Sequence, residues 1–470
     1  MEYISIKPVK SRELWRSDAF SGLSRIRCKH KELGLCSAQP SGGGILDPLG
    51  LVKAPLVLPQ VYEIEQRFDD TRVTDPRQAV RCAAEEARIA ACLAPGMKVA
   101  VTAGSRGVRN IVALLSYLVE WLYEQQVEPF VVGAMGSHGG GEAKGQKELL
   151  RSLGITEQSV GCPVHTSDEV TLIGMTPQGH KVYCDTLAFE SDGIIVMNRV
   201  KPHTSFRGRI ESGICKMMAV GLGKAAGATY VHRLGPAMMA EAIPAMSRVF
   251  IESGKILGAL GILENAFDET AEISGIRVEQ ILEKEPLLLE KARAMMASLP
   301  VDEIDVLVVR QMGKNYSGTG MDTNILGRFR LSDLADPGIP DVKRVVALDL
   351  SPESHGNATG VSLADVITTR IASAYDRKAT YLNSLTSTLL HRAAIPPAMD
   401  NDWAAVGLAV LSLGGSTPDL KLAIIDNTLH IERLFVSESL LPDVARRAHV
   451  KVLRGPMQVE FGRDHNLLPL

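Results

Sequence analysis

A dense group of reactive side chains follows one apolar run in the middle of the sequence. The run GIIVMN (Gly193–Asn198) precedes KPHTSFRGRIESGICKMMAVGLG, which carries His203 and Lys216, and then KAAGATYVHR, which carries His232. A loop that only connects two elements does not need so many titratable groups. Imidazole has an unperturbed pKa of about 6.5, so histidines can exchange protons near neutral pH. Lys216 lies among apolar and small residues, where a lysine can lose its proton and act as a nucleophile.

Another histidine, His138, follows the apolar run EPFVVGAMG in the same way. If His138 and His203 approached one substrate carbon from opposite faces, one could remove a proton and the other deliver one, which gives racemisation or epimerisation. A metal site formed by the same histidines stays open, because their spacings fit no compact ligand motif such as HExxH. His165, in VHTSDE, is a weaker candidate, and the other seven histidines are interpreted as structural.

The glycine-rich segments near these residues contain neither common nucleotide-binding fingerprint. No GxGxxG opens a helix that is followed by an acidic residue, and GxxxxGK[ST] is missing. The segment GSRGVRN (Gly104–Asn110) precedes a predicted helix, whose backbone amides could hold a phosphate with Arg106 as a charged clamp. For Lys216 the plain alternative is a lysine at a helix start with its stem buried.

Strands and helices alternate around these residues. Apolar runs predict strands at 97–104, 128–136 and 193–198, and helical periodicity predicts helices at 110–126 and 141–155. This alternation is typical of a parallel α/β sheet. Ligands of such sheets bind beyond the carboxyl ends of the strands. The three polar loops that follow these strands are therefore expected to converge on one cleft.

A second α/β region begins near residue 300. Strands are predicted at 303–313, 342–350 and 420–426, and a helix at 362–376. The expected fold class is α/β, with two α/β domains whose mainly parallel sheets face each other across an active-site cleft. The expected boundaries are an N-terminal segment 1–95 that packs on the first domain, a cofactor-binding domain 96–299, a second domain 300–430, and a C-terminal segment 431–470 that returns to the first domain.

Composition limits the partners that the chain can have. Its 470 residues are 45% hydrophobic, 22% charged and 5% aromatic, with a net charge of −3. This balance predicts neither nucleic-acid nor membrane binding. No run of eighteen apolar residues predicts a membrane span, and the charged start MEYISIKPVK does not resemble a signal peptide. Seven widely spaced cysteines without a CxxC pair indicate reduced thiols, so a cytoplasmic location is expected.

Taken in order, these segments resemble those of the lactate racemase family, whose enzymes use a nickel-pincer nucleotide cofactor. VTAGSRG resembles a strand end of that family and places Arg106 on its arginine. GAMGSHGGG places His138 on the first catalytic histidine, and KPHTSFRGRIESGICK places His203 on the second. The resemblance makes Lys216 the residue that tethers the cofactor through a thioamide. His232, sixteen residues later, corresponds to the nickel-ligating histidine.

Further residues are assigned around this set. Ser105, Ser212 and Gly213 are expected to contact the cofactor together with Arg106. GMDTNILGRFR resembles a segment of the second domain of the family and makes Arg330 the basic residue that contacts substrate. Extra basic and polar groups are expected to bind substrate as well: Lys201, Lys314 and Tyr316. They favour a 2-hydroxy acid larger and more polar than lactate, such as a sugar acid (an aldonate) or a dicarboxylate.

The resemblance implies a racemase or epimerase of a 2-hydroxy acid. A histidine would take the hydroxyl proton while the hydride on the same carbon moves to and from the cofactor. The expected partners are the small-molecule acid and cofactor-biosynthesis proteins, and a homo-oligomer is left open. Ala103 and Gly107 replace an acidic residue and a proline of the family, and the first ninety residues show no match. A nicotinamide-dependent oxidoreductase of a hydroxy acid and a non-catalytic ligand-binding homologue are the alternatives.

Overall fold

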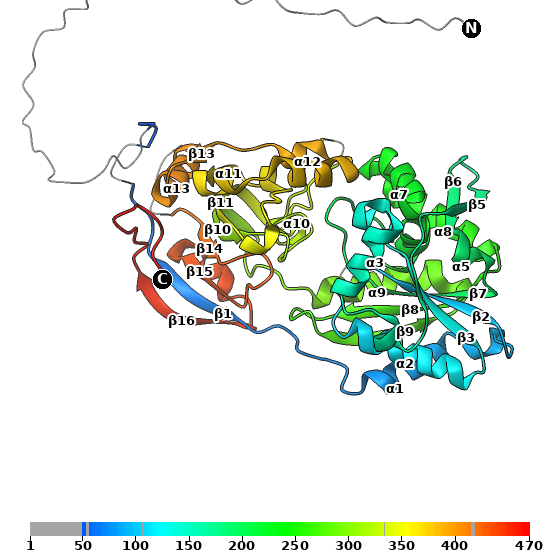
Figure 1. Cartoon of the computed structure of the whole chain (residues 1–470). Helices are drawn as coiled ribbons and strands as arrows, with labels where there is room; N and C mark the ends of the chain where they lie inside the picture. Colours follow the sequence, from blue (N-terminus) through cyan, green and yellow to red (C-terminus); the bar gives the residue numbers. More distant parts are fainter. Residues whose placement is uncertain (1–48, 53–55, 106, 333, 415–418) are drawn as a thin grey trace, which may run out of the picture. The chain divides into compact units, whose positions relative to one another are not determined.

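Two large sheets organise the described part of the chain, which comprises residues 49–52, 56–105, 107–332, 334–414 and 419–470 of a computed structural model. Figure 1 shows the strands of each sheet with the helices that cover them. Both sheets are mainly parallel and carry helices between their strands, as the alternation in the sequence predicts. The fold class is therefore α/β.

The first sheet has the strand order β4-β3-β2-β7-β8-β9. Its strands are β2 (Lys98–Ala103), β3 (Glu128–Gly133), β4 (Val164–His165), β7 (Gly193–Arg199), β8 (Ile256–Glu264) and β9 (Thr270–Ile276). Every neighbouring pair is parallel except β8 and β9. The three apolar runs predicted as strands are β2, β3 and β7. A separate hairpin pairs β5 (Val170–Met175) with β6 (Lys181–Asp185).

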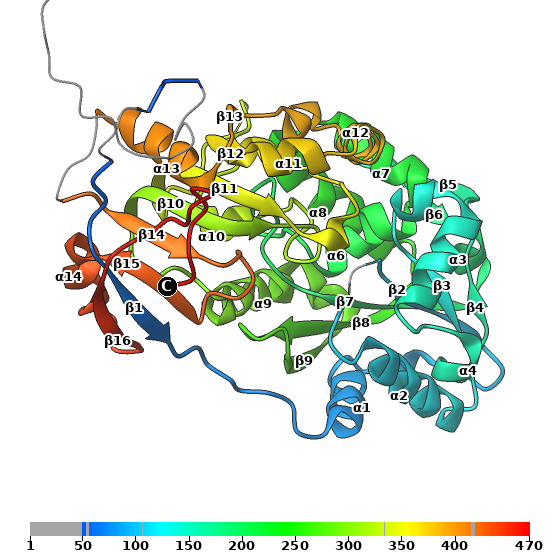
Figure 2. The same cartoon turned by 60° about the vertical axis from the view of Figure 1, so that its left-hand side comes forward.

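Helices cover both faces of the first sheet. One face packs against α1 (Pro76–Glu86), η1 (Ile89–Cys92), α2 (Ile111–Glu124), α3 (Ala143–Ser152) and α4 (Glu157–Val160). The other packs against α5 (Thr186–Glu190), α6 (Ile214–Lys216), η3 (Met217–Leu222), α7 (Lys224–Arg233), α8 (Pro236–Glu252) and α9 (Ile281–Met295). Figure 2 shows α1, α2 and α4 together on one side of the strands. Because side chains alternate along a strand, Val99 and Val101 face one helix layer and Ala100 the other.

The second sheet has the strand order β13-β12-β11-β10-β14-β15-β1-β16. Its strands are β1 (Val61–Gln66), β10 (Glu303–Met312), β11 (Asp341–Leu350), β12 (Val366–Thr368), β13 (Ala398–Met399), β14 (Leu422–Ile425), β15 (Arg433–Ser437) and β16 (Val450–Met457). The strands from β13 to β14 are parallel, and the last three are antiparallel. Its helices are α10 (Thr323–Leu326), α11 (Thr369–Ala374), α12 (Arg377–Thr386), η7 (Leu390–Ala393), α13 (Asp402–Leu411) and α14 (Leu441–Val444), with short turns η5 (Pro352–Ser354), η6 (Val361–Leu363) and η8 (Glu438–Leu440).

The N-terminal and C-terminal segments were both expected to pack on the first domain, but strands from both segments lie in the second sheet. Within the expected segment 1–95, α1 does pack against the first sheet, but β1 pairs with β15 and β16 in the second. In the C-terminal segment 431–470, β15 and β16 also lie in the second sheet. Pairing between such distant segments leaves no local signal in the sequence. Residues 1–48 of the N-terminal segment lie outside the described residues.

The segment 362–376 is another difference, because a strand occupies part of the stretch that was predicted to be a helix. Strand β12 occupies Val366–Thr368, and only then does α11 follow. The three strand residues are β-branched and buried, and β12 pairs in parallel with both β11 and β13. Those neighbours satisfy its backbone, so sheet pairing overrides the helical periodicity of the stretch.

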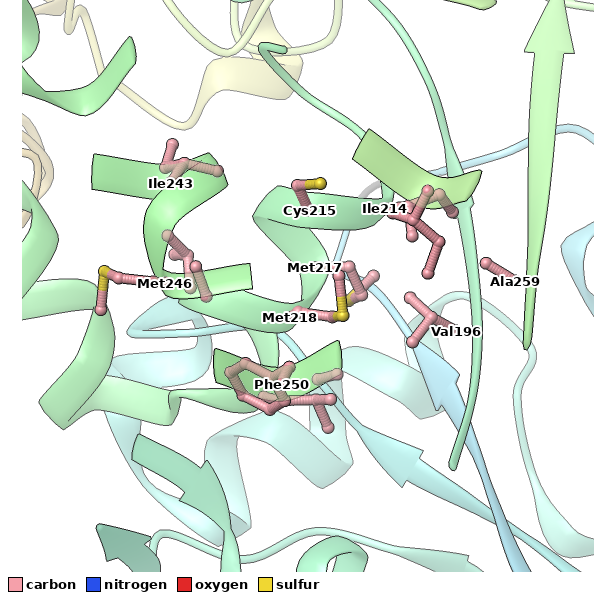
Figure 3. Close-up of a cluster of buried hydrophobic side chains, with 14 of the residues drawn as sticks. Val196, Ile214, Cys215, Met217, Met218, Ile243, Met246, Phe250 and Ala259 are labelled. Atoms are coloured by element: carbon pink, nitrogen blue, oxygen red, sulfur yellow. The ribbon is translucent and has the colours of Figure 1, made fainter. Parts of the chain in front are cut away.

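A buried cluster surrounds the backbone that carries Lys216. Figure 3 shows Cys215, Met217 and Met218 packed among side chains that include Met246 and Phe250 of α8. Because the residues on both sides of Lys216 are buried, packing fixes the path of this segment.

Two further observations concern thiols and membranes. The cysteines in the described ranges are free: Cys82, Cys92, Cys162, Cys184 and Cys215. No helix in the same ranges has the length and apolar character that crossing a bilayer requires.

Candidate active site

A cavity of about 820 Å³ is lined by loops that follow strands of both sheets. Ser105 follows β2, His138 follows β3, His203 follows β7 and Lys314 follows β10, and all four line the cavity. Lys216, at the end of α6, lines it too. The loops after the three predicted strands of the first sheet therefore meet, as the rule for parallel sheets predicts.

His203 is held by three contacts. Its backbone N–H donates to Oε2 of Glu211 at 2.6 Å, and its Nδ1 accepts from the backbone N–H of Ser205 at 3.1 Å. Its Nε2 lies 2.6 Å from Nζ of Lys216. The ring also packs on Phe206, with 4.4 Å between ring centroids. These contacts fix the orientation of the imidazole in the loop after β7.

Burial also affects the protonation of His203. It lowers the pKa of the imidazole well below the ordinary value of 6.5, and the nearby charge of Lys216 adds to the effect, so the ring is neutral at neutral pH. Its two ring nitrogens lie beside the backbone N–H of Ser205 and the amine of Lys216.

Lys216 follows a turn that a buried carboxylate holds. Oε2 of Glu285 accepts from the backbone N–H of Cys215 at 2.9 Å. A Cβ on Gly213 would lie 2.1 Å from Oε1 of Glu285, so any larger residue would displace the carboxylate. Burial raises the pKa of Glu285 from 4.5 to about 7, and its bonds to Cys215 oppose the shift. Glu285 thus anchors the start of the segment that carries the lysine.

The π-helical turn η3 follows Lys216 directly and connects it to the loop of His138. The carbonyl of Gly221 in η3 accepts from the backbone N–H of Gly136 at 3.2 Å. A Cβ on Gly221 would come within 2.8 Å of the carbonyl oxygen of Ala134, so glycine permits this close approach. π-helical turns are rare and are often found at functional sites.

His232 occupies the last turn of α7 and lines the same cavity. Burial lowers its pKa from 6.5 to about 4, and the charge of Lys216 adds to the shift. Its imidazole is therefore uncharged at neutral pH. Its backbone carbonyl accepts from Oγ1 of Thr388 at 3.3 Å.

His138 is exposed on a loop of glycines with positive φ. Its Nδ1 contacts Oγ of Ser105, and its Nε2 is on the other side of the ring. The loop packs tightly on α3, because a Cβ on Gly145 would lie 1.9 Å from the carbonyl oxygen of Gly139. The close packing of the backbone at Gly139 against the backbone at Gly145 thus positions this histidine after the end of β3.

A buried network lies beneath the loop of His138. The fully buried Lys224 donates to the carbonyl of Gly133 and to Oε1 of Gln146, both at 2.7 Å. Its Nζ forms an ion pair with Asp185 at 3.3 Å, and both side chains are excluded from solvent. Nε2 of Gln146 then donates to the carbonyl of Gly136 at 3.1 Å. The network connects the start of α7 with the loop after β3.

Most other residues assigned from the sequence also line the cavity: Ser105, Lys201, Ser212, Lys314 and Tyr316. Gly213 is absent from the lining, and its carbonyl accepts from the side chain of Asn198 at 2.9 Å. Arg330 does not line the cavity either. It pairs with Asp365 and donates to the carbonyls of Ser362 and Ala364 at 2.9 Å. Arg106 lies outside the described residues, and His165, at the edge of the first sheet, is not in the lining.

Several residues that shape the site carry no recognisable signal in the sequence. Glu211, Lys224 and Glu285 act through partners that are often distant along the chain, as in the seventy residues between Cys215 and Glu285. Arg392 lines the cavity from η7. In the ranges described, no three His, Cys, Asp or Glu side chains gather as metal ligands.

Comparisons with known proteins gave one family-model match and a similar solved structure. No curated protein sequence is similar enough to count as a match. The chain is similar to the solved lactate racemase apoprotein from Thermoanaerobacterium thermosaccharolyticum, with 12% sequence identity and a TM-score of 0.48, over 78% of this chain and 98% of that one. Residues 60–239 match the family model of the lactate racemase N-terminal domain. This range starts earlier than the resemblance found in the sequence. It includes His138, His203, Lys216 and His232. Residues 60–239 are therefore similar to the lactate racemase N-terminal domain, in agreement with the resemblance found in the sequence.

Proposed function

We propose that this chain is a racemase or epimerase of a 2-hydroxy acid that works with a nickel-pincer nucleotide. The main support is the contact of 2.6 Å between Lys216 and His203 in a cavity that His138 and His232 also line. This contact places a potential attachment point beside a potential base. A binding cleft alone would not need a lysine amine held in this way.

The residues present fit such a cofactor. A metal ligand must be unprotonated, and the pKa of about 4 makes His232 a neutral imidazole over the physiological range. Covalent attachment uses a lysine amine, and Nζ of Lys216 lies 2.6 Å from Nε2 of His203, where both residues line the cavity. A cavity of about 820 Å³ is of the size that holds a nucleotide and a small acid. When bound, the cofactor would accept and return the hydride of the substrate carbon.

The two histidines would manage the proton of the substrate hydroxyl. His203 is neutral because it is buried among cations, so it is ready to accept a proton. His138 is exposed and lines the same cavity, and the contact of its Nδ1 with Ser105 orients the ring. Lys201, Lys314 and Tyr316 add polar groups to the wall, which favours an acid more polar than lactate, such as a sugar acid or a dicarboxylate.

The proposal is tested on protein co-expressed with a nickel-pincer cofactor pathway. Intact mass and nickel content should show one cofactor per chain, and 2-hydroxy acids should lose optical purity. Lys216→Ala should lose the added mass. His138→Ala and His203→Ala should keep it and lose more than about 100-fold in rate, because each removes one acid/base group.

Exposed residues outside the cavity provide matched controls, since Lys144→Ala and His449→Ala should change neither mass nor rate. If the added mass persisted in Lys216→Ala, the assignment of Lys216 as the attachment site would be wrong. If wild-type protein carried neither adduct nor nickel, a nicotinamide-dependent oxidoreductase or a non-catalytic binding protein would explain the cavity instead.

A further inference from the structure

Arg392 is a buried arginine whose side chain has no hydrogen-bond partner among the residues that the structure describes. It lies in η7, and only 1% of its surface is exposed. Its backbone is satisfied, because its N–H donates to the carbonyl of Leu389 and its carbonyl accepts from Gly360, at 2.9 and 2.8 Å. In contrast, its Nε, Nη1 and Nη2 make no hydrogen bond to any described residue.

This lack of partners is unusual for this chain. The buried Arg328 forms an ion pair with Asp365 at 2.8 Å and donates to the carbonyls of Leu363 and Val342. The charge of Asp336 acts on Arg392, but Oδ1 of Asp336 accepts from the backbone N–H groups of Phe329 and Arg330, at 2.6 and 2.9 Å. No ion pair in the described ranges includes Arg392.

The guanidinium of Arg392 keeps its charge despite its position. Burial lowers its pKa from 12.5 to about 10, so it remains protonated at neutral pH. An unpaired buried charge is costly, and proteins keep one where a ligand or reaction uses it. The planar donors of arginine match the oxygen atoms of a carboxylate or a phosphate.

Arg392 also belongs to the wall of the cavity that holds the candidate active site. Four residues earlier, Thr388 donates to the carbonyl of His232, so this part of the wall touches the end of α7. Another cation of the same wall, Lys314, is already engaged, because its Nζ donates to Asn383 at 2.7 Å and to the carbonyl of Gly318.

We propose that Arg392 binds an anionic oxygen group of the ligand in this cavity. The group is either a second carboxylate of the substrate or the phosphate of the nucleotide. The choice between these two sources rests on the function proposed above. The existence of an anion site at Arg392 does not depend on that function. Arg392 would then determine specificity, because ligands that lack the anionic group would bind weakly.

The experiment uses the full chain purified without cofactor and follows its melting temperature at constant ionic strength. The probes are lactate, malate and nicotinamide mononucleotide. We expect malate or the mononucleotide to raise the melting temperature of the wild-type protein above that with lactate. In Arg392→Met the same probe should bind about 10- to 100-fold more weakly, because a charge-assisted pair is lost.

The empty protein gives a second readout, which separates ligand binding from a structural role. Without ligand, Arg392→Met should melt at the same temperature as the wild type or about 1 to 3 °C higher, because an unpaired buried charge becomes apolar. The matched variant Arg328→Met removes a paired buried arginine and should melt lower. Arg392→Gln is a smaller change that makes the same comparison if the methionine variant does not fold.

Each outcome decides the proposal. A malate shift lost in Arg392→Met assigns the site to the substrate, and a mononucleotide shift lost there assigns it to the phosphate. If no probe shifts the wild type, or if the shift survives in both Arg392 variants, the proposal is wrong. A fall in melting temperature like that of Arg328→Met, with binding unchanged, would make Arg392 a structural residue. None of these readouts depends on cofactor loading, so failure of the racemase proposal would be seen separately.

Discussion

Two buried carboxylates support the two reactive residues of the segment after β7, and they differ in their charge partners. Glu211 holds the backbone of His203 and is balanced by Arg293 at 2.5 Å and Arg207 at 3.5 Å. Glu285 holds the turn before Lys216 without an ion pair in the described ranges, and one of its oxygens has no hydrogen-bond partner there. This difference explains why burial raises the pKa of Glu285 to about 7.

The stability of the protein should therefore depend on pH through Glu285. Between the unfolded pKa of 4.5 and the folded pKa of about 7, the folded state keeps a proton that the unfolded state has lost. Stability then falls as pH rises through this window, by at most about 1.4 kcal/mol per pH unit, and levels off above it. Glu285→Gln lacks this titration, so its stability relative to wild type should grow from pH 5 to pH 7. Urea unfolding at several pH values measures the difference.

The control is Glu283→Gln, which changes an exposed carboxylate on the same helix. Its stability difference from wild type should not follow pH in this way. A difference for Glu285→Gln that stays constant from pH 5 to pH 8 would contradict the raised pKa.

Sequence patterns identified elements better than they identified the contacts between them. β2, β3 and β7 were predictable because each is a continuous apolar run, and the strand-end rule then brought His138 and His203 to one cavity. β12 was not predictable, because three residues carry little periodicity and neighbouring strands decide their state. Supporting residues such as Lys224 were also missed, because a buried lysine looks like a surface lysine until its partners are known.

At the scale of elements, the ion pair of Lys224 and Asp185 should contribute strongly to stability. Lys224→Met leaves Asp185 buried without a countercharge, so we expect a loss of about 3 to 5 kcal/mol in the free energy of unfolding. Denaturant titration measures it. Adding Asp185→Asn should recover part of the loss, because the isolated charge is removed.

The comparison variant is Lys343→Met, which breaks the exposed ion pair with Asp305 and should cost less than about 1 kcal/mol. An equally small loss for Lys224→Met would show that the buried pair is not stabilising.

At the scale of the whole molecule, the loop of His203 is held by residues of both sheets. Arg207 donates to the carbonyl of His203 at 2.7 Å, contacts the side chain of Asn324 and lies 4.5 Å above the ring of Phe329. Oγ1 of Thr323 donates to the carbonyl of Thr204 at 3.0 Å. The loop of His203, which follows a strand of the first sheet, is thus also supported by α10, which belongs to the second.

Removing that support should loosen the loop and leave the rest of the first sheet unchanged. In Asn324→Ala we expect faster amide hydrogen exchange across residues 201–209, because Arg207 loses a partner. Exchange in β2 should stay as in the wild type. Double-mutant cycles with Arg207→Met should give a coupling of about 0.5 to 3 kcal/mol between the two positions. Unchanged exchange in the loop would mean that the bonds of Glu211 and Thr323 are sufficient to hold it.

The position of β1 has a consequence for the synthesis of this protein on the ribosome. β1 pairs with β15 and β16, and its residue Glu65 meets Arg433, which is 368 residues further along the chain. At about 5 to 20 residues per second, β1 waits roughly 20 to 70 s for its partners to be translated. The strands of the first sheet are complete long before, since β9 ends at Ile276. The nascent chain therefore carries an unpaired strand edge while its reactive domain can already fold, and that edge is the part a chaperone would need to shield.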